Sequence, residues 1–249
     1  ISKGAKFFTT TRKGAELIKY ASNAFLATKI SFINEISKLT DFYGGDINEI
    51  RSGMGSDVRI NPNFLYAGIG FGGSCFPKDL TGLIHSFKKA KINPELIKAT
   101  LNVNNEQKEY FLRKIYNLYS PRELSKKTIT VWGIAFKSNT DDIRESVGIK
   151  IVKALSPKVA KIKIYDAIAI KNAKKELSNL RNISYSKTLA SSIKNSHFLL
   201  ITTDSKAFWS FDHELLTTLQ DNRIFDGRNM LDIDAINALE IEYFGIGRG

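Results

Sequence analysis

A single cysteine lies inside the densest glycine cluster of the sequence. Cys75 belongs to residues 68–79, which read Gly-Ile-Gly-Phe-Gly-Gly-Ser-Cys-Phe-Pro-Lys-Asp. Glycines at this density disfavour strand and helix, and they predict unusual backbone angles and a close approach of the main chain to another group. A thiol beside Lys78 and Asp79 can serve as a nucleophile, because neighbouring charges tune its ionisation. A lone cysteine can equally be a small buried hydrophobe, and the residue pattern leaves both interpretations open.

A helix is predicted directly after this cysteine. Pro77 suits a first helical turn, and apolar side chains then recur at helical spacing as far as about Lys91. Cys75 would therefore lie near the N-terminus of a helix, where free N–H groups and the helix dipole lower the pKa of a thiol.

The surrounding sequence predicts a largely helical first half. Apolar residues from Thr11 to Asp41 fall on more than one face, which indicates a long helix buried on several sides in a subunit or domain core. Two glycines at 44 and 45 end this helix, and a short helix follows as far as Gly53. Another helix is predicted over residues 93–118. Residues 1–10 form a polar lead-in.

From residue 128 onward the hydrophobic period changes. Residues 120–127 are polar, contain a proline and indicate a linker. Short apolar runs then alternate with helical patterns, which predicts a doubly wound parallel sheet of the α/β class. The predicted strands are 128–133, 161–165, 198–203, 223–226 and 241–244, and the predicted helices are 146–155, 169–177, 189–194 and 213–219. The sequence thus divides into a helical domain, residues 1–120, and an α/β domain, residues 121–249.

Charged residues follow several of these strands, at the edge where sheets of this class bind ligands. The first such turn lacks the Gly-x-Gly-x-x-Gly fingerprint and places a phenylalanine and Lys137 where a dinucleotide would lie. A different anion, held by Lys137 and Arg228, fits this edge better. From its spacing, Arg144 is expected to pair with Asp141 or Asp142 in a surface salt bridge.

The composition limits the class of protein. The chain has 249 residues, of which 43% are hydrophobic and 25% charged, and this balance is typical of a globular protein with a real core. The formal net charge is +12, but the lysines form neither a basic block nor an aromatic-basic ladder, which argues against nucleic acid as a partner. No apolar run is long enough to span a bilayer, and the first residues lack the apolar core of a signal peptide.

The cysteine and histidine contents carry further expectations. One cysteine excludes an internal disulfide, which fits a reducing cytoplasm. His85, His197 and His213 share no ligand spacing, so no metal site is expected. The chain begins with Ile1 rather than methionine, which leaves open that it is a fragment.

Four segments, in the same order, resemble the UDP-glucose/GDP-mannose dehydrogenase family. They are residues 19–27 on the long helix, residues 64–79 around the cysteine, residues 133–146 after the first strand, and residues 226–228. The resemblance covers nearly the whole chain from about Glu16. It implies a central helical dimerisation domain followed by a Rossmann-like, UDP-binding domain.

The resemblance implies a chemical role for Cys75. In this family the equivalent thiolate attacks a C6 aldehyde to give a thiohemiacetal, a second oxidation gives a thioester, and water releases the carboxylate. Lys19 and Asn23 lie one helical turn apart and would together hold an oxyanion or a water at C6. Asp79 matches the carboxylate that helps proton transfer in the hydrolytic step.

The resemblance also implies which residues bind the ligands. The residues that would meet the UDP-sugar are Lys19, Asn23, Arg59, Phe64, Leu65, Tyr66, Ala67, Gly68, Gly72, Lys137 and Arg228. Arg59 would reach into the site of a neighbouring subunit, and the glycine backbone would lie against the sugar nucleotide. Lys78 and Arg144 would meet the NAD end of the site, so for Arg144 this implication replaces the expected surface salt bridge.

The activity implied by the resemblance is the NAD-dependent, four-electron oxidation of UDP-glucose to UDP-glucuronate. The sequence of residues 70–79 is most similar to the branch of the family that oxidises UDP-glucose, with GDP-mannose and UDP-N-acetylmannosamine as alternative sugar nucleotides. The long helix implies a homodimer, because it carries more apolar surface than one subunit is expected to cover.

The family's N-terminal third has no counterpart in this sequence. That third is a Rossmann domain with the NAD fingerprint and a catalytic glutamate and threonine. We therefore expect the chain to bind UDP-sugar at best partially, and neither to bind NAD tightly nor to turn over alone. An alternative from another class is a nucleotide-sugar-binding or dimerisation module without activity.

Overall fold

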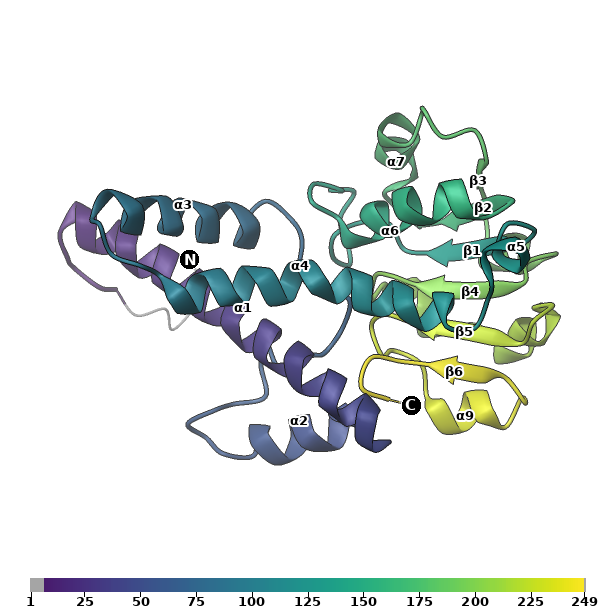
Figure 1. Cartoon of the computed structure of the whole chain (residues 1–249), viewed down its shortest axis with the longest axis horizontal. Coiled ribbons are helices and arrows are strands. Elements are labelled where there is room, and N and C mark those ends of the chain that lie inside the picture. Colours follow the sequence, from purple (N-terminus) through teal and green to yellow (C-terminus); the bar gives the residue numbers. More distant parts are fainter. Residues whose placement is uncertain (1–6, 249) are drawn as a thin grey trace.

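The computed structural model describes residues 7–248, and it has a helical part and a sheet part (Figure 1). Its first four helices are α1 (Arg12–Tyr43), α2 (Ile47–Gly55), α3 (Phe76–Lys89) and α4 (Glu95–Tyr116). These bounds lie close to the helices that the apolar periodicity predicts. Two predictions concern the first residues of the chain: the polar lead-in over residues 1–10 and the lack of a signal peptide. Residues 1–6 lie outside the described range.

Local signals at both ends set the bounds of α1. Thr11 caps the N-terminus by accepting a hydrogen bond from the Gly14 N–H. Gly44 ends the helix in the left-handed region, at a φ of 69°, where glycine has no steric penalty. Between these ends, one side of α1 packs on α3 and α4, and it buries small residues such as Ala24 and Ala27.

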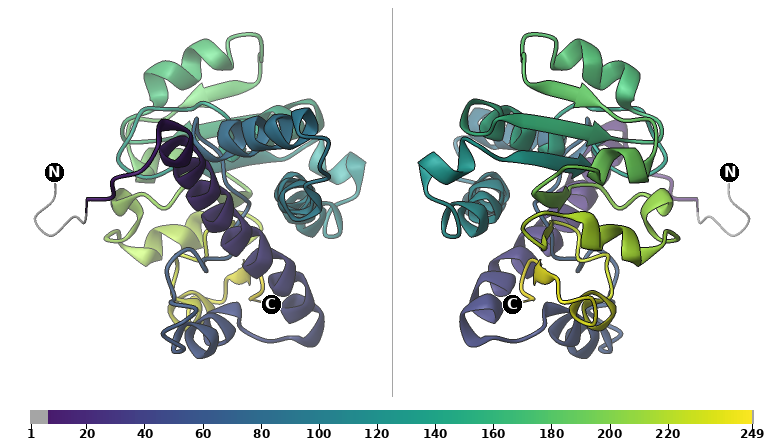
Figure 2. Two further views of the ribbon diagram at one scale, coloured as in Figure 1. Left: turned by 90° about the vertical axis from the view of Figure 1, so that its left-hand side faces the viewer. Right: turned by 90° about the vertical axis from the view of Figure 1, so that its right-hand side faces the viewer.

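The opposite side of α1 remains open in the described chain. In the left view of Figure 2, α1 lies in front of the other elements. Four apolar side chains at seven-residue intervals are exposed along it: Ile18 (50%), Phe25 (67%), Phe32 (47%) and Leu39 (53%). The prediction that α1 is buried on several sides is therefore wrong for one chain, because this row of side chains has no cover among residues 7–248.

The second half forms one parallel sheet in the order β3-β2-β1-β4-β5-β6. Its strands are β1 (Thr128–Trp132), β2 (Lys161–Tyr165), β3 (Ile183–Tyr185), β4 (Phe198–Ile201), β5 (Arg223–Asp226) and β6 (Glu242–Phe244). The connecting helices are α6 (Val147–Leu155), α7 (Ile170–Glu176), α8 (Leu189–Ile193) and α9 (Ile233–Asn237). The predicted doubly wound α/β class is confirmed.

Successive strand residues belong to two different hydrophobic clusters, so both faces of the sheet are covered. On β4, Phe198 and Leu200 pack in one cluster with α4 and α6, whereas Leu199 and Ile201 pack in the other with α8 and α9. Continuous apolar strands with this division are typical of parallel sheets.

The first cluster also joins the two halves of the chain. Phe111, Leu112 and Ile115 near the end of α4 are buried in the same cluster as Ile129 and Val131 of β1. The helical part and the sheet part thus share one core.

Some elements differ from the sequence-based expectation. The predicted linker contains a short helix, α5 (Pro121–Leu124), which begins with a capping box between Ser120 and Glu123. Neither β3 nor α9 was predicted. Residues His213–Thr218 are helical, as predicted, and form a 3-10 helix. These elements have three to six residues each, and such short runs give weak periodic signals.

Candidate active site

The only cysteine lies at the N-terminal cap of α3. Cys75 is exposed, and its own side chain makes no capping hydrogen bond. Pro77 occupies the first turn of α3, as the sequence predicts. The free N–H groups of this turn favour an anion at the position of the thiol.

A buried carboxylate lies one turn into the same helix. Asp79 is fully buried, and its Oδ2 atom accepts hydrogen bonds from Lys19 Nζ at 2.5 Å and Asn23 Nδ2 at 2.6 Å. Both donors come from α1 and lie one helical turn apart. The structure therefore brings together the four residues for which the resemblance implies catalysis: Cys75, Lys19, Asn23 and Asp79.

The electrostatics of this group favour charged forms of both partners. Burial raises the pKa of Asp79, but the hydrogen bonds from Lys19 and Asn23 outweigh burial and leave this pKa below its ordinary value. The hydrogen bond to Asp79 raises the pKa of Lys19. The other carboxylate oxygen, Asp79 Oδ1, is buried without a hydrogen-bond partner among the described residues, and Lys78 Nζ lies 3.9 Å from it.

The lowered pKa of Asp79 predicts a pH-dependent stability. A carboxylate with a lowered folded-state pKa stabilises the fold above its unfolded pKa of about 4, and this contribution disappears as the pH falls through the folded-state value. We expect Asp79→Asn to lower the free energy of unfolding by about 1–2 kcal/mol at pH 7 and to have no pH-specific cost in strong acid. Urea unfolding at a series of pH values measures this difference.

The matched control for this prediction is Asp57→Asn. Asp57 also pairs with an arginine, Arg59, but the arginine side chain is 86% exposed, so a small effect is expected at every pH. A stability difference for Asp79→Asn that stays constant from acid to neutral pH would contradict the role of the charged form.

A groove of about 640 Å³ lies beside Cys75, between α3 and the loop after β1. Its lining residues are Gly73, Ser74, Pro77, Lys78, Thr81, Arg144 and Glu145. Arg144 forms a bidentate pair with Asp142, at 3.0 and 2.6 Å, which agrees with the salt bridge expected from spacing. The same arginine also lines the groove. Arg144 can therefore both pair with Asp142 and lie near Cys75.

The glycines before Cys75 allow close contact between the two halves of the chain. A Cβ atom on Gly72 would lie 2.1 Å from the carbonyl oxygen of Glu145, and one on Gly68 would lie 2.9 Å from that of Gly227. Gly73 has a φ of 80° and donates its N–H to the Arg144 carbonyl. In the described chain, glycine is therefore required at these positions by close contact with the sheet part. The family resemblance implied a different reason for these glycines, a contact with a sugar nucleotide.

The residues just before the glycines alternate between core and surface. Leu65 and Ala67 are buried, whereas Phe64 and Tyr66 are exposed by 37% and 59%. Phe64 adopts a φ of 65°, unusual for a bulky residue. A contact of this segment with a ligand remains a prediction for the two exposed side chains.

Arg228 links the end of the sheet to the glycine segment. Its Nε donates to the Thr202 carbonyl at 3.0 Å and its Nη1 to the Gly70 carbonyl at 3.4 Å. Lys137 is exposed at the same edge of the sheet, beside the ring of Phe136. That ring lies against Gly73, since a Cβ there would approach it to 2.5 Å. Both predicted anion-binding residues therefore lie on the side of the sheet that faces the cysteine segment.

Asp166, at the end of β2, already occupies the turn after β1. Its Oδ2 accepts the N–H groups of Ile134 at 2.8 Å and Ala135 at 3.3 Å, and its Oδ1 accepts those of Ile168 and Ala169. A dinucleotide pyrophosphate would need the same N–H groups. The structure thus supports the prediction that this turn does not bind a dinucleotide.

Arg59 lies on the segment after α2, which projects as a loop from the helical part in Figure 1. Its guanidinium pairs with Asp57 of the same loop. Lys29 holds the loop by donating to the carbonyls of Ile60 and Asn61. The predicted contact of Arg59 with a neighbouring subunit stays a prediction.

Several residues that hold the site were missed by the sequence analysis. Asn34, Asn104 and Gln107 bind the backbone of the glycine segment. Amide side chains in the middle of a helix carry no periodic signal that distinguishes this role from an ordinary polar position.

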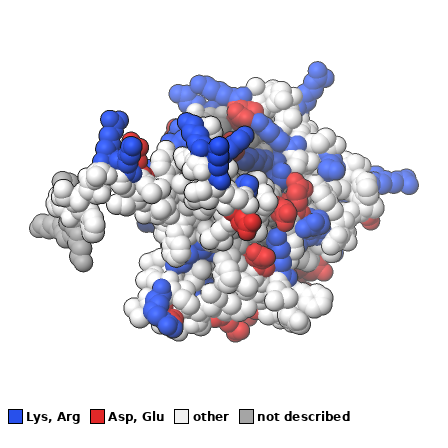
Figure 3. Space-filling view, turned by 60° about the vertical axis from the view of Figure 1, so that its left-hand side comes forward, with Lys and Arg blue, Asp and Glu red and all other residues white. Residues whose placement is uncertain are grey.

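Three further observations over residues 7–248 concern metals, surface charge and membranes. No group of three His, Cys, Asp or Glu residues there could hold a metal ion. On the face shown in Figure 3, acidic side chains lie among the lysines and arginines. No helix in the same range combines the length and apolar character needed to cross a membrane.

Comparison with known proteins identifies two matching domains. The central-domain model of the UDP-glucose/GDP-mannose dehydrogenase family matches residues 13–106, and its UDP-binding-domain model matches residues 130–233. The UDP-glucose 6-dehydrogenase YwqF of Bacillus subtilis is 42% identical over 242 residues, which cover 97% of this chain and 54% of that protein. The UDP-glucose 6-dehydrogenase of Rickettsia felis is 38% identical, over 99% of this chain and 55% of that protein.

Solved structures show the same fold. A UDP-glucose dehydrogenase from Pyrobaculum islandicum superposes with a TM-score of 0.84 at 31% identity, over 96% of this chain and 52% of that one. A UDP-D-ManNAc dehydrogenase from Pyrococcus horikoshii gives a TM-score of 0.83 at 25% identity, over 99% and 55%. The chain spans about half the length of the relatives it matches. By its two matching domains and its fold, the chain belongs to the UDP-glucose/GDP-mannose dehydrogenase family.

Proposed function

We propose that the protein containing this chain is an NAD-dependent UDP-glucose 6-dehydrogenase that oxidises UDP-glucose to UDP-glucuronate. The observation that carries the proposal is the exposed Cys75 at the start of α3, one turn from the Lys19–Asn23–Asp79 hydrogen-bonded group. The high identity to UDP-glucose 6-dehydrogenases supports the choice of sugar nucleotide. An exposed thiol suits a reducing compartment such as the cytoplasm.

Cys75 supplies the nucleophile in this proposal. Its thiolate adds to the C6 aldehyde formed by the first oxidation, and the new C–S bond gives a thiohemiacetal. Lys19 and Asn23 each donate one N–H to Asp79 and have further N–H groups. These remaining donors stabilise the C6 oxygen as it becomes negative.

Asp79 acts in the last step. Oxidation of the thiohemiacetal gives a thioester, and attack by water breaks the C–S bond and returns the thiol. Asp79 accepts the proton of that water through Lys19, which passes one of its own protons to Asp79 Oδ2 and takes up the proton of the water.

The groove beside Cys75 carries cations that fit the diphosphate of NAD. Lys78 and Arg144 place two cations on the groove next to the thiol. NAD, when bound, accepts the hydride in each of the two oxidations. Asp166 blocks the turn after β1, so the NAD fingerprint is expected elsewhere in the protein.

Calorimetry on this chain tests the choice of ligand. We expect UDP-glucose to bind at least about tenfold more tightly than GDP-mannose, because the second half of the chain matches a UDP-binding domain. We expect a similar preference over UDP-N-acetylmannosamine, because the chain is most similar to UDP-glucose 6-dehydrogenases among the relatives above. Tighter binding of another sugar nucleotide would move the proposal to that branch. Binding of none would leave the alternative, a dimerisation module without activity.

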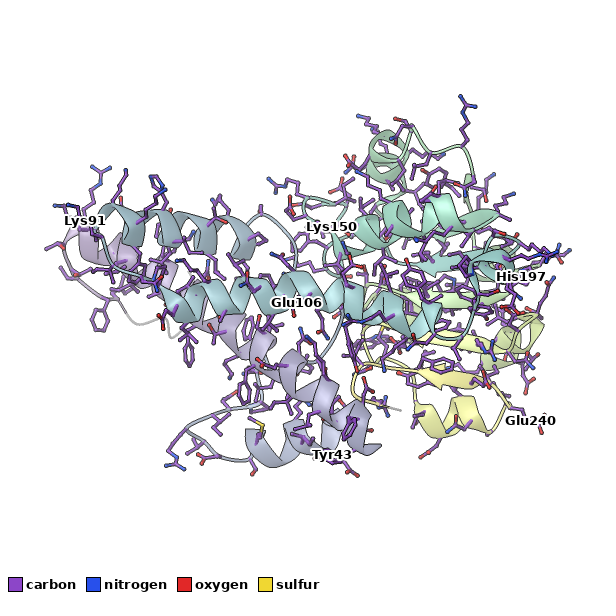
Figure 4. The ribbon with its side chains drawn as sticks, in the orientation of Figure 1. Tyr43, Lys91, Glu106, Lys150, His197 and Glu240 are labelled. Carbon is purple, nitrogen blue, oxygen red and sulfur yellow. The ribbon has the colours of Figure 1, made fainter. Side chains whose placement is uncertain are left out.

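We also propose that two copies associate through the exposed apolar row of α1. A repeat of seven residues is the spacing at which helices pair along their length, and Ile18, Phe25, Phe32 and Leu39 follow it. Tyr43, at the end of the same helix, is 76% exposed and extends the apolar surface (Figure 4).

Sedimentation measures this association. Phe25→Ser combined with Phe32→Ser is expected to weaken the dimer by about 100-fold or more, because each buried phenylalanine contributes about 1.5–3 kcal/mol. Trp209→Ser is the control, since Trp209 is also exposed (63%) but lies on the sheet part. A monomer at high concentration for the unchanged chain would contradict the proposal.

A further inference from the structure

The segment of residues 68–73, here called the glycine loop, lies between the two halves of the chain and hydrogen-bonds to both. Toward the sheet part, the Ile69 N–H donates to the Gly227 carbonyl at 3.0 Å and the Gly73 N–H to the Arg144 carbonyl at 3.0 Å. Toward the helical part, the bonding groups are those of Gly68 and Phe71. The loop thus runs like a strand whose two edges have different partners.

On the helical side the partners are amide side chains rather than another strand. Phe71 donates its N–H to Asn104 Oδ1 at 2.7 Å and accepts from Asn104 Nδ2 at 3.1 Å. Gly68 donates its N–H to Asn34 Oδ1 at 2.8 Å and accepts from Gln107 Nε2 at 3.0 Å. An amide offers one donor and one acceptor side, so it can bind the backbone as a strand neighbour would.

The packing around these amides leaves the loop little freedom. Asn34 and Gln107 are fully buried. Gly70 has a φ of 98°, and a Cβ there would lie 2.9 Å from Asn104 Oδ1 and 3.2 Å from the Asn104 carbonyl oxygen. The loop therefore lies flat on α4, and only glycine fits at this position.

We propose that Asn34, Asn104 and Gln107, the amide clamp, are positioning residues that fix the glycine loop and through it the place of the Cys75 thiol. Cys75 follows the loop directly and has no hydrogen bond of its own that would orient it beyond a 3.9 Å contact with Ser74 Oγ. The inferred role of the clamp in catalysis rests on the proposed function. Its hydrogen bonds to the glycine loop do not depend on any substrate. It also ties the thiol to Lys19 and Asn23, because Asn34 lies on the same helix, α1.

The single cysteine makes the test direct. The rate of alkylation of Cys75 by iodoacetamide, measured over a range of pH, reports the surroundings of the thiol without substrate or NAD. We expect Asn104→Ala to change the limiting rate by about fivefold or more, or to displace the pH–rate profile. The control is Asn105→Ala on the same helix, since Asn105 is exposed, and its profile should match that of the unchanged chain.

A purely structural role for Asn104 would give another result. Asn104→Ala would then lower the urea midpoint but leave the rate and the pH profile of alkylation unchanged, and the proposal would be overturned. Calorimetry with UDP-glucose on the unchanged chain separates the two ideas: absence of binding counts against the proposed function, while unchanged alkylation in the variant counts against the clamp alone.

Asn104→Asp covers the case in which Asn104→Ala does not fold. At neutral pH the introduced carboxylate can accept from the Phe71 N–H but cannot donate to its carbonyl. In acid, the protonated carboxyl regains a donor, so protection of the Phe71 N–H from hydrogen exchange, relative to the unchanged chain, should rise as the pH is lowered to about 4. Protection that does not change with protonation would contradict the clamp.

Discussion

Cys75→Ala is expected to lower the rate of UDP-glucuronate formation by at least about 10⁴-fold, because in the proposed mechanism its thiol forms the covalent intermediate. The measurement is UDP-glucuronate itself, by chromatography of the reaction of UDP-glucose and NAD with the protein that contains this chain, because the first oxidation can give NADH without the thiol. Among the described residues there is no second thiol to take over the reaction, since the sequence has one cysteine. The variant should still bind UDP-glucose, because the thiol contributes to bond formation rather than to recognition of the nucleotide.

The matched control is Ser86→Ala on the exposed side of α3, with an expected rate within about threefold of the unchanged protein.

Mass spectrometry of the Asp79→Asn variant gives a second observation. If Asp79 assists hydrolysis, this variant accumulates a sugar-nucleotide adduct on Cys75. Production of UDP-glucuronate at the normal rate by Cys75→Ala would show that the thiol is not the nucleophile.

Gly72→Ala is expected to lower the free energy of unfolding by about 3 kcal/mol, at the upper end of the cost of overpacking. The added Cβ would lie 2.1 Å from the carbonyl oxygen of Glu145, and this neighbour is backbone, so it cannot rotate away. Urea unfolding gives the change in stability, and the alkylation rate of Cys75 shows whether the displacement reaches the thiol.

Gly53→Ala is the control for this glycine. Gly53 lies in α2, and a Cβ there would meet nothing within 4 Å, so alanine should be neutral or should stabilise the helix by up to about 1 kcal/mol. Equal stabilities for the Gly72→Ala variant and the unchanged chain would contradict this prediction. They would mean that the loop around Glu145 can move away from Gly72 at no cost in free energy.

The sequence predicted the long elements of the fold because their signals are local and repeated. The apolar spacing of α3, its proline and the strand runs of β1 and β4 each identify their element without reference to the rest of the chain. The alternation of strands and helices then determines a parallel sheet. The three-residue β3 was missed because its residues are only partly buried and form a single short run.

The site was predictable to a different degree. Cys75 and Asp79 are neighbours in sequence, so their glycine and proline context identified a candidate segment, and the family resemblance supplied Lys19 and Asn23. The clamp residues were not predictable, because their role depends on which backbone groups the packing of α1 and α4 brings to them. The same applies to Asp166, because its hydrogen-bond partners Ile134 and Ala135 precede it by 32 and 31 positions in the sequence.

The hydrophobic cluster that α4 shares with the sheet limits how the molecule can move. Phe111, Leu112 and Ile115 are each almost fully buried beneath the strands, so separating the two halves would expose them to water. A hinge between the halves is consequently unfavourable. Cys75 is already exposed beside the groove that Arg144 lines, so a reagent or substrate reaches it without opening of the domains.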